Sequence, residues 1–212
     1  MRCAVSPSLD LDASSHHGVW LEALRQESIE FVAVPESGSR AARQTDFRKI
    51  EGVILADEPG SRSAGLEDGR DLSFHRTERE LVRFARARRI PIVGIGHWAE
   101  FLGLYFGGRL RPHPDQRPVD RPMDLRVAPG FGPSRALVHP AGRMHCDPKD
   151  FPAALVPIAW DEHEHIAGFV HRDEPILGIC WRPDGAADLV SNFLKGRNRQ
   201  PAGGPELNLR TG

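Results

Sequence analysis

Residues 91–108, PIVGIGHWAEFLGLYFGG, have the pattern of a tight turn that could present a reactive side chain. The apolar run 92–95 is typical of a buried strand, and apolar residues recur at helical spacing after Gly96. In a nucleophile elbow, the reactive side chain stands on the turn between such a strand and such a helix. The turn position here is Gly96, so the pattern predicts an elbow that carries no nucleophile.

Two other side chains could supply nucleophilic or acid–base chemistry. Cys180 lies two residues before Arg182, and on one extended strand both side chains would share a face, where the guanidinium would favour the thiolate. Cys180 fits equally well as a small buried apolar residue. His97 follows the elbow glycine and could act as a base or bind a ligand, or it could make a structural polar contact at a helix start.

Residues 160–171, WDEHEHIAGFVH, concentrate three histidines and three acidic residues. His163 and His165 alternate and would share one strand face, as metal ligands often do, and His171 follows in the same segment. A polar, solvated turn between two strands accounts for the same residues, because such spacing is weak support for a metal site. We expect a solvated hairpin, with no metal or cofactor, and keep a metal-binding hairpin as the alternative.

The composition excludes several classes of function. The chain has 212 residues and a formal net charge of -1, enough for one α/β domain and without the basic field that attracts nucleic acid or an anionic membrane. No apolar run reaches the roughly 18 residues of a membrane span, and the first residues, MRCAVSPSLD, lack the apolar region of a signal peptide. Three cysteines without disulfide spacing suit a reducing compartment, so we expect a cytoplasmic protein.

The first half of the chain alternates between strand and helix patterns. This rhythm predicts a parallel sheet with right-handed crossovers. The Pro- and Arg-rich stretch 109–121 predicts an irregular loop, after which short strands and one helix, 186–194, follow. The strands expected in the first half are 2–5, 30–34, 52–55 and 92–95, with helices around Trp20, Leu21 and Leu24, after a capping box of Thr77 and Glu80, and after Gly96.

The chain shows no internal repeat and no composition shift that would mark a second domain. We therefore expect one domain over residues 1–195. Residues 196–212, GRNRQPAGGPELNLRTG, are expected to form an extended C-terminal tail, because they offer few apolar residues for packing.

Four segments resemble one known family, the class I glutamine amidotransferases, and within it the γ-glutamyl-γ-aminobutyrate hydrolase (peptidase C26) branch. The segments are EGVIL, GRDLSFHRTERELVRFARARRIPIVGI, FGGRL and PILGICWRPD. The resemblance covers about residues 2–195. It implies an α/β, flavodoxin-like fold of three layers, with a mainly parallel central sheet and helices on both faces.

The resemblance also implies a cysteine mechanism, most of whose residues are missing from this chain. The family pattern Gly-Ile-Cys-x-Gly-x-Gln supplies the nucleophile, and Gly-Val-Gln-Trp-His-Pro-Glu supplies the histidine and glutamate that activate it. The matching positions here are Gly96, Arg182 and Asp184. Gly96 cannot form an acyl-enzyme, and the guanidinium of Arg182 stays protonated and cannot act as a general base. Asp184 keeps a carboxylate, which we expect to pair with Arg182.

Neighbouring positions of the family pattern differ as well. Trp98 and Glu100 stand where the family has glycine and glutamine. The oxyanion loop, which has small residues in the family, contains Asp57 and Glu58, whose carboxylates would oppose a developing oxyanion. The family's Asn-Ser-x-His stretch corresponds to HPAGRM, residues 139–144, which does not match.

We therefore predict a pseudoenzyme that binds a small polar ligand, a peptide or a partner protein, or that forms a homodimer, as an accessory subunit in a biosynthetic pathway. Its cleft would lie at the strand ends, where α/β sheets bind ligands. The alternative is an active amide or γ-glutamyl hydrolase or transferase that uses Cys180 and His97. The residues expected to line the cleft are Asp57, Glu58, His97, Glu100, Arg182 and Asp184.

Overall fold

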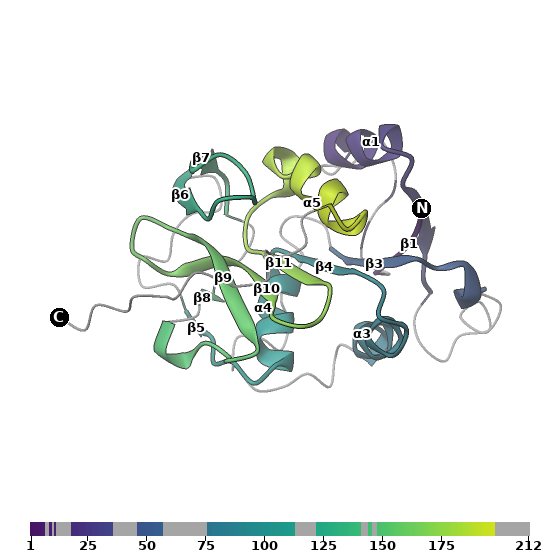
Figure 1. Ribbon diagram of the computed structural model, residues 1–212, viewed down its shortest axis with the longest axis horizontal. Coiled ribbons are helices and arrows are strands. Elements are labelled where there is room, and N and C mark those ends of the chain that lie inside the picture. Colours follow the sequence, from purple (N-terminus) through teal and green to yellow (C-terminus); the bar gives the residue numbers. More distant parts are fainter. Residues whose placement is uncertain are drawn as a thin grey trace.

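The computed structural model describes residues 1–6, 9, 11, 18–35, 46–56, 76–112, 122–140, 144–145 and 148–197. A nine-stranded sheet crosses this part of the molecule (Figure 1). Its strands are β1 (Arg2–Val5), β2 (Glu30–Ala33), β3 (Gly52–Leu55), β4 (Ile92–Ile95), β6 (Met123–Val127), β7 (Arg135–Val138), β9 (Leu155–Trp160), β10 (Ile166–His171) and β11 (Ile176–Ile179).

Helices cover both faces of this sheet. Figure 1 shows α1 and α5 on one face and α3 and α4 on the other. A smaller sheet pairs β5 (Arg111–Pro112) with β8 (Met144–His145). The helices are α1 (Gly18–Gln26), α3 (Arg76–Arg88), α4 (His97–Tyr105) and α5 (Ala187–Leu194), with 3-10 turns η1 (Phe47–Lys49), η2 (Pro148–Asp150) and η3 (Pro183–Gly185).

The strand order is β2-β1-β3-β4-β11-β10-β9-β6-β7. Neighbours from β2 through β11 pair in parallel, and this part has the 2-1-3-4-5 order of flavodoxin-like doubly wound sheets. Beyond β11 the strands pair antiparallel. The expected α/β fold, with its three layers, is confirmed, and so is the change to short, turn-connected strands in the second half.

The central strands are buried because both of their faces pack against helices. Every residue of β3, β4 and β11 is buried, as expected for parallel strands covered on both sides. Successive side chains of β4 belong to different cores. Val93 packs in the core that contains residues of α1 and α5, and Ile92 packs in the core that contains residues of α3 and α4.

Helix α3 differs at its start from the capping box that the sequence predicts. It begins at Arg76, so Thr77 lies inside the first turn and is not the N-cap. Arg76 Nε donates to Glu80 Oε1 at 3.3 Å across one turn, which places Glu80 in an i,i+4 ion pair instead of a capping box. The predicted helix is confirmed, but its predicted cap is wrong.

Several expectations fall partly outside the described residues. Within the stretch 109–121, predicted to be an irregular loop, β5 forms, and residues 113–121 are not described. The boundary at residue 195 stays a prediction, because residues 198–212 are also outside the described part. None of the helices in the described ranges has the length and apolar character needed to cross a membrane.

Candidate ligand-binding site at the β4–α4 turn

The turn between β4 and α4 has the backbone geometry of an elbow. Gly96 stands between strand and helix with φ 63° and ψ −126°, a conformation that residues with a Cβ rarely adopt. Its N–H donates to the Ile179 carbonyl at 2.8 Å, and its carbonyl accepts from the Ala99 N–H at 3.0 Å. The turn is therefore fixed to β11 on one side and to α4 on the other.

Helix α4 approaches β4 so closely that one strand residue must be glycine. A Cβ added at Gly94 would lie 2.6 Å from Leu102 Cδ1 and 2.8 Å from the Trp98 carbonyl oxygen. Trp98 does not loosen this turn, because its indole is buried in the core and meets the Phe101 ring edge-on at 5.4 Å. The tight elbow persists although tryptophan stands where the resembled family has glycine.

The end of β11 lies beside this turn. Ile95 and Ile179 are partners in the parallel register, so Cys180 follows next to Gly96. Cys180 is half-buried and packs against the core on the α3–α4 face. Its N–H donates to the Ala167 carbonyl at 2.8 Å. Cys180 thus has both a structural role in the core and a position next to the elbow.

Neither Cys180 nor Arg182 lies on β11, so the one strand that the sequence predicts for both residues is wrong. Strand β11 ends at Ile179, and Arg182 is the N-cap of η3, with φ −62° and ψ 137°. The backbone at Arg182 is still extended, but the hydrogen-bond partner changes after Cys180, because Trp181 forms a β-bridge with Pro140. The Arg182 N–H donates to the His139 carbonyl at 2.8 Å.

His97 and Glu100 occupy the first turn of α4, and both are buried, with 8% and 3% of their surface exposed. The His97 ring lies 4.4 Å from the Trp98 ring between centroids. A carboxylate near a helix N-terminus is stabilised by the helix dipole, yet an acidic residue this deeply buried is uncommon in proteins. Glu100 therefore places a carboxyl group inside the molecule, directly after the elbow.

The acidic residues of the predicted cleft are only partly visible. Asp184 is exposed in η3, and within the described ranges no ion pair joins it to Arg182, so the expected pairing is wrong. Asp57 and Glu58 lie outside the described residues. Gly96, His97 and Glu100 lie at the turn after β4 and in the first turn of α4, and Cys180 and Arg182 follow the end of the neighbouring strand β11.

Sequence reasoning did not single out Ser6, which holds Ala56 directly after β3. Ser6 is fully buried just after β1. Its hydroxyl donates to the Ala56 carbonyl and accepts from the Ala56 N–H at 3.1 Å. A polar residue directly after a buried strand was the available signal, because the carboxyl ends of parallel strands meet at one edge.

The histidine-rich segment forms the predicted turn between β9 and β10. Asp161, 5% exposed, accepts from the backbone N–H groups of His163 and His165, each at 2.9 Å. Burial alone would raise the pKa of Asp161, but the hydrogen bonds from His165 and His163 outweigh it and hold that pKa below its ordinary value. The acidic residue therefore has a structural role in shaping the turn.

His171 does not join the other two histidines, because it stands at the opposite end of β10. The His163 and His165 rings lie 6.0 Å apart between centroids. Within the ranges that the structure describes, no group of three or more histidine, cysteine or acidic side chains could hold a metal ion. His171 therefore does not share a turn with His163 and His165, and the metal-binding hairpin stays a hypothesis.

No family model matches the sequence. The chain is 36% identical over 126 residues to anthranilate synthase component 2 of Thermus thermophilus. That match covers 51% of this chain and 58% of the relative, so it spans less than two thirds of the relative's length.

Solved structures resemble the whole fold at low identity. A protein from Thermoplasma acidophilum, described as a GMP synthase subunit, has a TM-score of 0.66 and 18% identity, and the match covers 92% of each chain. A glutamine amidotransferase from Thermotoga maritima has a TM-score of 0.67 and 15% identity, over 92% of this chain and 81% of that one. The chain thus has the fold of the class I glutamine amidotransferases, as its sequence motifs imply.

Proposed function

We propose that this protein is a glutamine amidotransferase-like pseudoenzyme whose elbow binds a small polar ligand or a partner protein. One observation carries the proposal: the strained elbow conformation is kept at residue 96, while the residue there is glycine. Without a nucleophile side chain, the turn forms no acyl-enzyme. Arg182, which stands where the family has its histidine, remains protonated and removes no proton near neutral pH.

The groups around the elbow suit recognition of a zwitterionic molecule. Arg182 presents a half-buried guanidinium beyond β11, and Glu100 places a buried carboxylate in the first turn of α4. A guanidinium binds carboxylates through paired hydrogen bonds, and a carboxylate accepts hydrogen bonds from an ammonium group. An amino acid carries both groups. The proposed small ligand is therefore an amino acid or a molecule with the same two charged groups.

A partner protein is the second form of the same proposal. The Thermus relative is named as a component of a synthase, and the Thermoplasma neighbour is described as one subunit of a synthase. Those names support, for this chain, a place as an accessory subunit in a biosynthetic enzyme. The cleft at the elbow would then communicate ligand binding to the partner.

Calorimetric titration with glutamine tests the small-ligand form. We expect binding by the parent protein, weakened by about tenfold in Arg182→Gln, because a charge-assisted bond is lost. Arg126→Gln is the matched control, since Arg126 lies on β6, three strands from β11 in the sheet, and pairs with Glu164. Equal loss of affinity in both variants contradicts the proposed role of Arg182.

Active chemistry through Cys180 is the competing function, and one observation favours it. The Cys180 side chain is half-buried next to the elbow. Cys3 offers an internal reference, because burial raises the pKa of its thiol to about 12 and leaves it unreactive. Faster alkylation of Cys180 than of a free thiol of ordinary reactivity, with Cys3 unmodified, supports the enzyme. Slow alkylation at both positions supports the pseudoenzyme.

A further inference from the structure

A cavity of about 480 Å³ lies at the other end of the central strands from the elbow. Its wall includes Pro91 and Pro175, which precede β4 and β11, and the last residues of β10 and α5. Its apolar lining includes the buried side chains of Val170, Phe193 and Leu194. The elbow, by contrast, follows the carboxyl ends of β4 and β11, so the two places are separated by the length of the strands.

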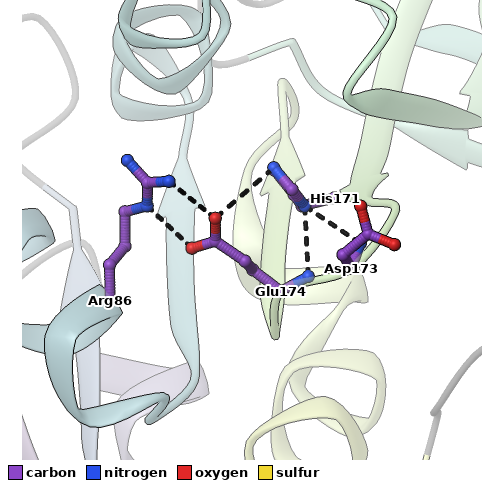
Figure 2. Close-up of polar contacts among 4 residues, drawn as sticks. All are labelled: Arg86, His171, Asp173 and Glu174. Carbon is purple, nitrogen blue, oxygen red and sulfur yellow. Dashed lines mark hydrogen bonds and ion pairs between the residues drawn. The ribbon is translucent and has the colours of Figure 1, made fainter.

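Two charged groups of the cavity wall are already neutralised. Arg86 donates to both carboxylate oxygens of Glu174, at 2.7 and 2.6 Å (Figure 2). The hydrogen bonds from Arg86 hold the pKa of Glu174 below its ordinary value. Lys195 donates to Glu27 at 2.6 Å. Neither Glu174 nor Lys195 therefore adds an uncompensated charge to the cavity.

His171 shapes the turn that carries the remaining charges. Its Nδ1 accepts from the backbone N–H groups of Asp173 and Glu174, each at 3.1 Å, as Figure 2 shows. This arrangement requires an unprotonated Nδ1, and burial lowers the pKa of His171, which favours the neutral ring. The ring also contacts the Phe106 ring, 4.8 Å away between centroids. The buried His171 side chain thus holds the turn between β10 and β11, which carries Arg172.

The rim of the cavity keeps an excess of positive charge. Arg89 and Arg172 are exposed there, and within the described part of the chain neither has an ion-pair partner. Asp173 is the one exposed acidic residue of the cavity lining. The charges at the rim therefore sum to one positive, next to an apolar floor.

Arg89 keeps its place at the rim against its conformational preference. It follows the last residue of α3 with φ 54°, and the Ile90 and Arg89 N–H groups donate to the Ala85 and Arg86 carbonyls, both at 3.1 Å. This is the Schellman arrangement, whose left-handed residue is usually glycine. A glycine would close the helix more easily, but it would remove the guanidinium from the rim.

We propose that this cavity binds a small organic anion, with a carboxylate or phosphate group on an apolar body. The apolar body packs against Val170, Phe193 and Leu194, and the anionic group binds the guanidinium groups of Arg89 and Arg172. Guanidinium groups bind both kinds of anion through paired hydrogen bonds, and the volume lies within the range of ligand pockets. This site is independent of the function proposed for the elbow.

Methyl-labelled full-length protein, titrated with benzoate, phenyl phosphate and uncharged benzamide, tests the proposal. We expect both anions to shift the methyl resonances of Val170 and Leu194, and benzamide to bind at least about tenfold more weakly. The stronger of the two anions identifies the chemical class. The proposal is overturned if these methyl groups do not respond, or if benzamide binds as tightly as benzoate.

Variants separate the rim charges from general charge effects. We expect Arg89→Gly and Arg172→Gln each to weaken benzoate binding by about tenfold, and Asp173→Asn to strengthen it. Arg89→Gly should melt at a temperature no lower than the parent protein, so its loss of binding is not a loss of folding. Arg83→Gln is the control, since Arg83 is an exposed arginine of α3 away from the cavity. An equal loss in Arg83→Gln overturns the proposal.

Discussion

The backbone has a positive φ near both ends of β4, but only one of the two residues there is a glycine. After the strand, Gly96 has φ 63°, and the residue best suited to that conformation occupies it. Before the strand, Arg89 has φ 54°, and a residue poorly suited to that conformation occupies it. One end has a tight turn without a side chain. The other end keeps its side chain although the turn disfavours it.

This difference shows where side-chain chemistry matters in this protein. The turn at Gly96 is fixed to β11 and to α4 by backbone hydrogen bonds, so it places α4 against β4 without a side chain at that position. A left-handed position does not by itself require a charge, because Ser28 has φ 62° in the same arrangement after α1, so the role of Arg89 rests on its place at the cavity rim. We therefore expect substitutions at the elbow to affect mainly folding, and substitutions at Arg89 to affect mainly binding.

The largest effect is expected for Gly94→Ala. The new methyl group would overlap Leu102 and the Trp98 carbonyl oxygen, and only the leucine end can move easily. We expect a loss of about 2–3 kcal/mol in the free energy of unfolding, as for other overpacked cores, measured by urea denaturation. Gly103→Ala in α4 is the matched control, since nothing lies within 4 Å of its added Cβ. That variant should be unchanged or more stable, because alanine favours the helix.

Gly96→Ala is expected to have the next largest effect. The Cβ would have to adopt φ 63° with ψ −126°, at a cost of about 1–3 kcal/mol. The same denaturation experiment measures it. A neutral result would mean that the turn relaxes, and it would remove the basis for a retained elbow.

Glu174→Gln tests the ion pair between Arg86 and Glu174, through the pH dependence of the free energy of unfolding. Because Arg86 holds the pKa of Glu174 below its ordinary value, the stabilising contribution of the carboxylate is present above the unfolded-state pKa, about 4.3. It is lost as the pH falls through the lower folded-state pKa. The free energy of unfolding of the parent should therefore exceed that of the variant by about 1 kcal/mol at pH 7, and the difference should shrink as the pH falls below the unfolded-state pKa. A constant difference across this range contradicts the role of the ion pair.

The smallest effect, of opposite sign, is expected for Arg89→Gly. Glycine adopts the left-handed conformation more readily, so we expect a gain of about 0.5–1 kcal/mol in the free energy of unfolding. Thermal melting in parallel with Arg83→Gly measures it, because glycine inside α3 should instead cost about 1 kcal/mol. A destabilised Arg89→Gly would show that Arg89 stabilises the fold and would weaken the contrast with Gly96.

The sequence was sufficient where the pattern is local. The run 92–95 and the glycine after it predicted both β4 and the elbow, because burial on two faces and a tight turn leave short-range signatures. Local patterns also misled. Thr77 and Glu80 indicated an N-cap, but Thr77 lies inside the first turn of α3. The apolar run before Cys180 indicated one strand as far as Arg182, but β11 ends at Ile179.

Features that join distant segments could not be predicted. Arg86 and Glu174 are 88 residues apart, and nothing near either residue indicates the other. His171 was grouped with His163 and His165 by its nearness in sequence, but a strand of six residues carries it to the other edge of the sheet. The elbow was thus visible in the sequence, and the cavity with its arginine rim became visible only in the folded chain.

The most direct test of the emptied elbow is ammonia release from glutamine by the parent protein, with Cys180→Ala in parallel. Because Gly96 and Arg182 supply neither nucleophile nor base, we expect no release by either protein above the rate without protein. Turnover by the parent that disappears in Cys180→Ala would contradict the pseudoenzyme and identify Cys180 as the nucleophile.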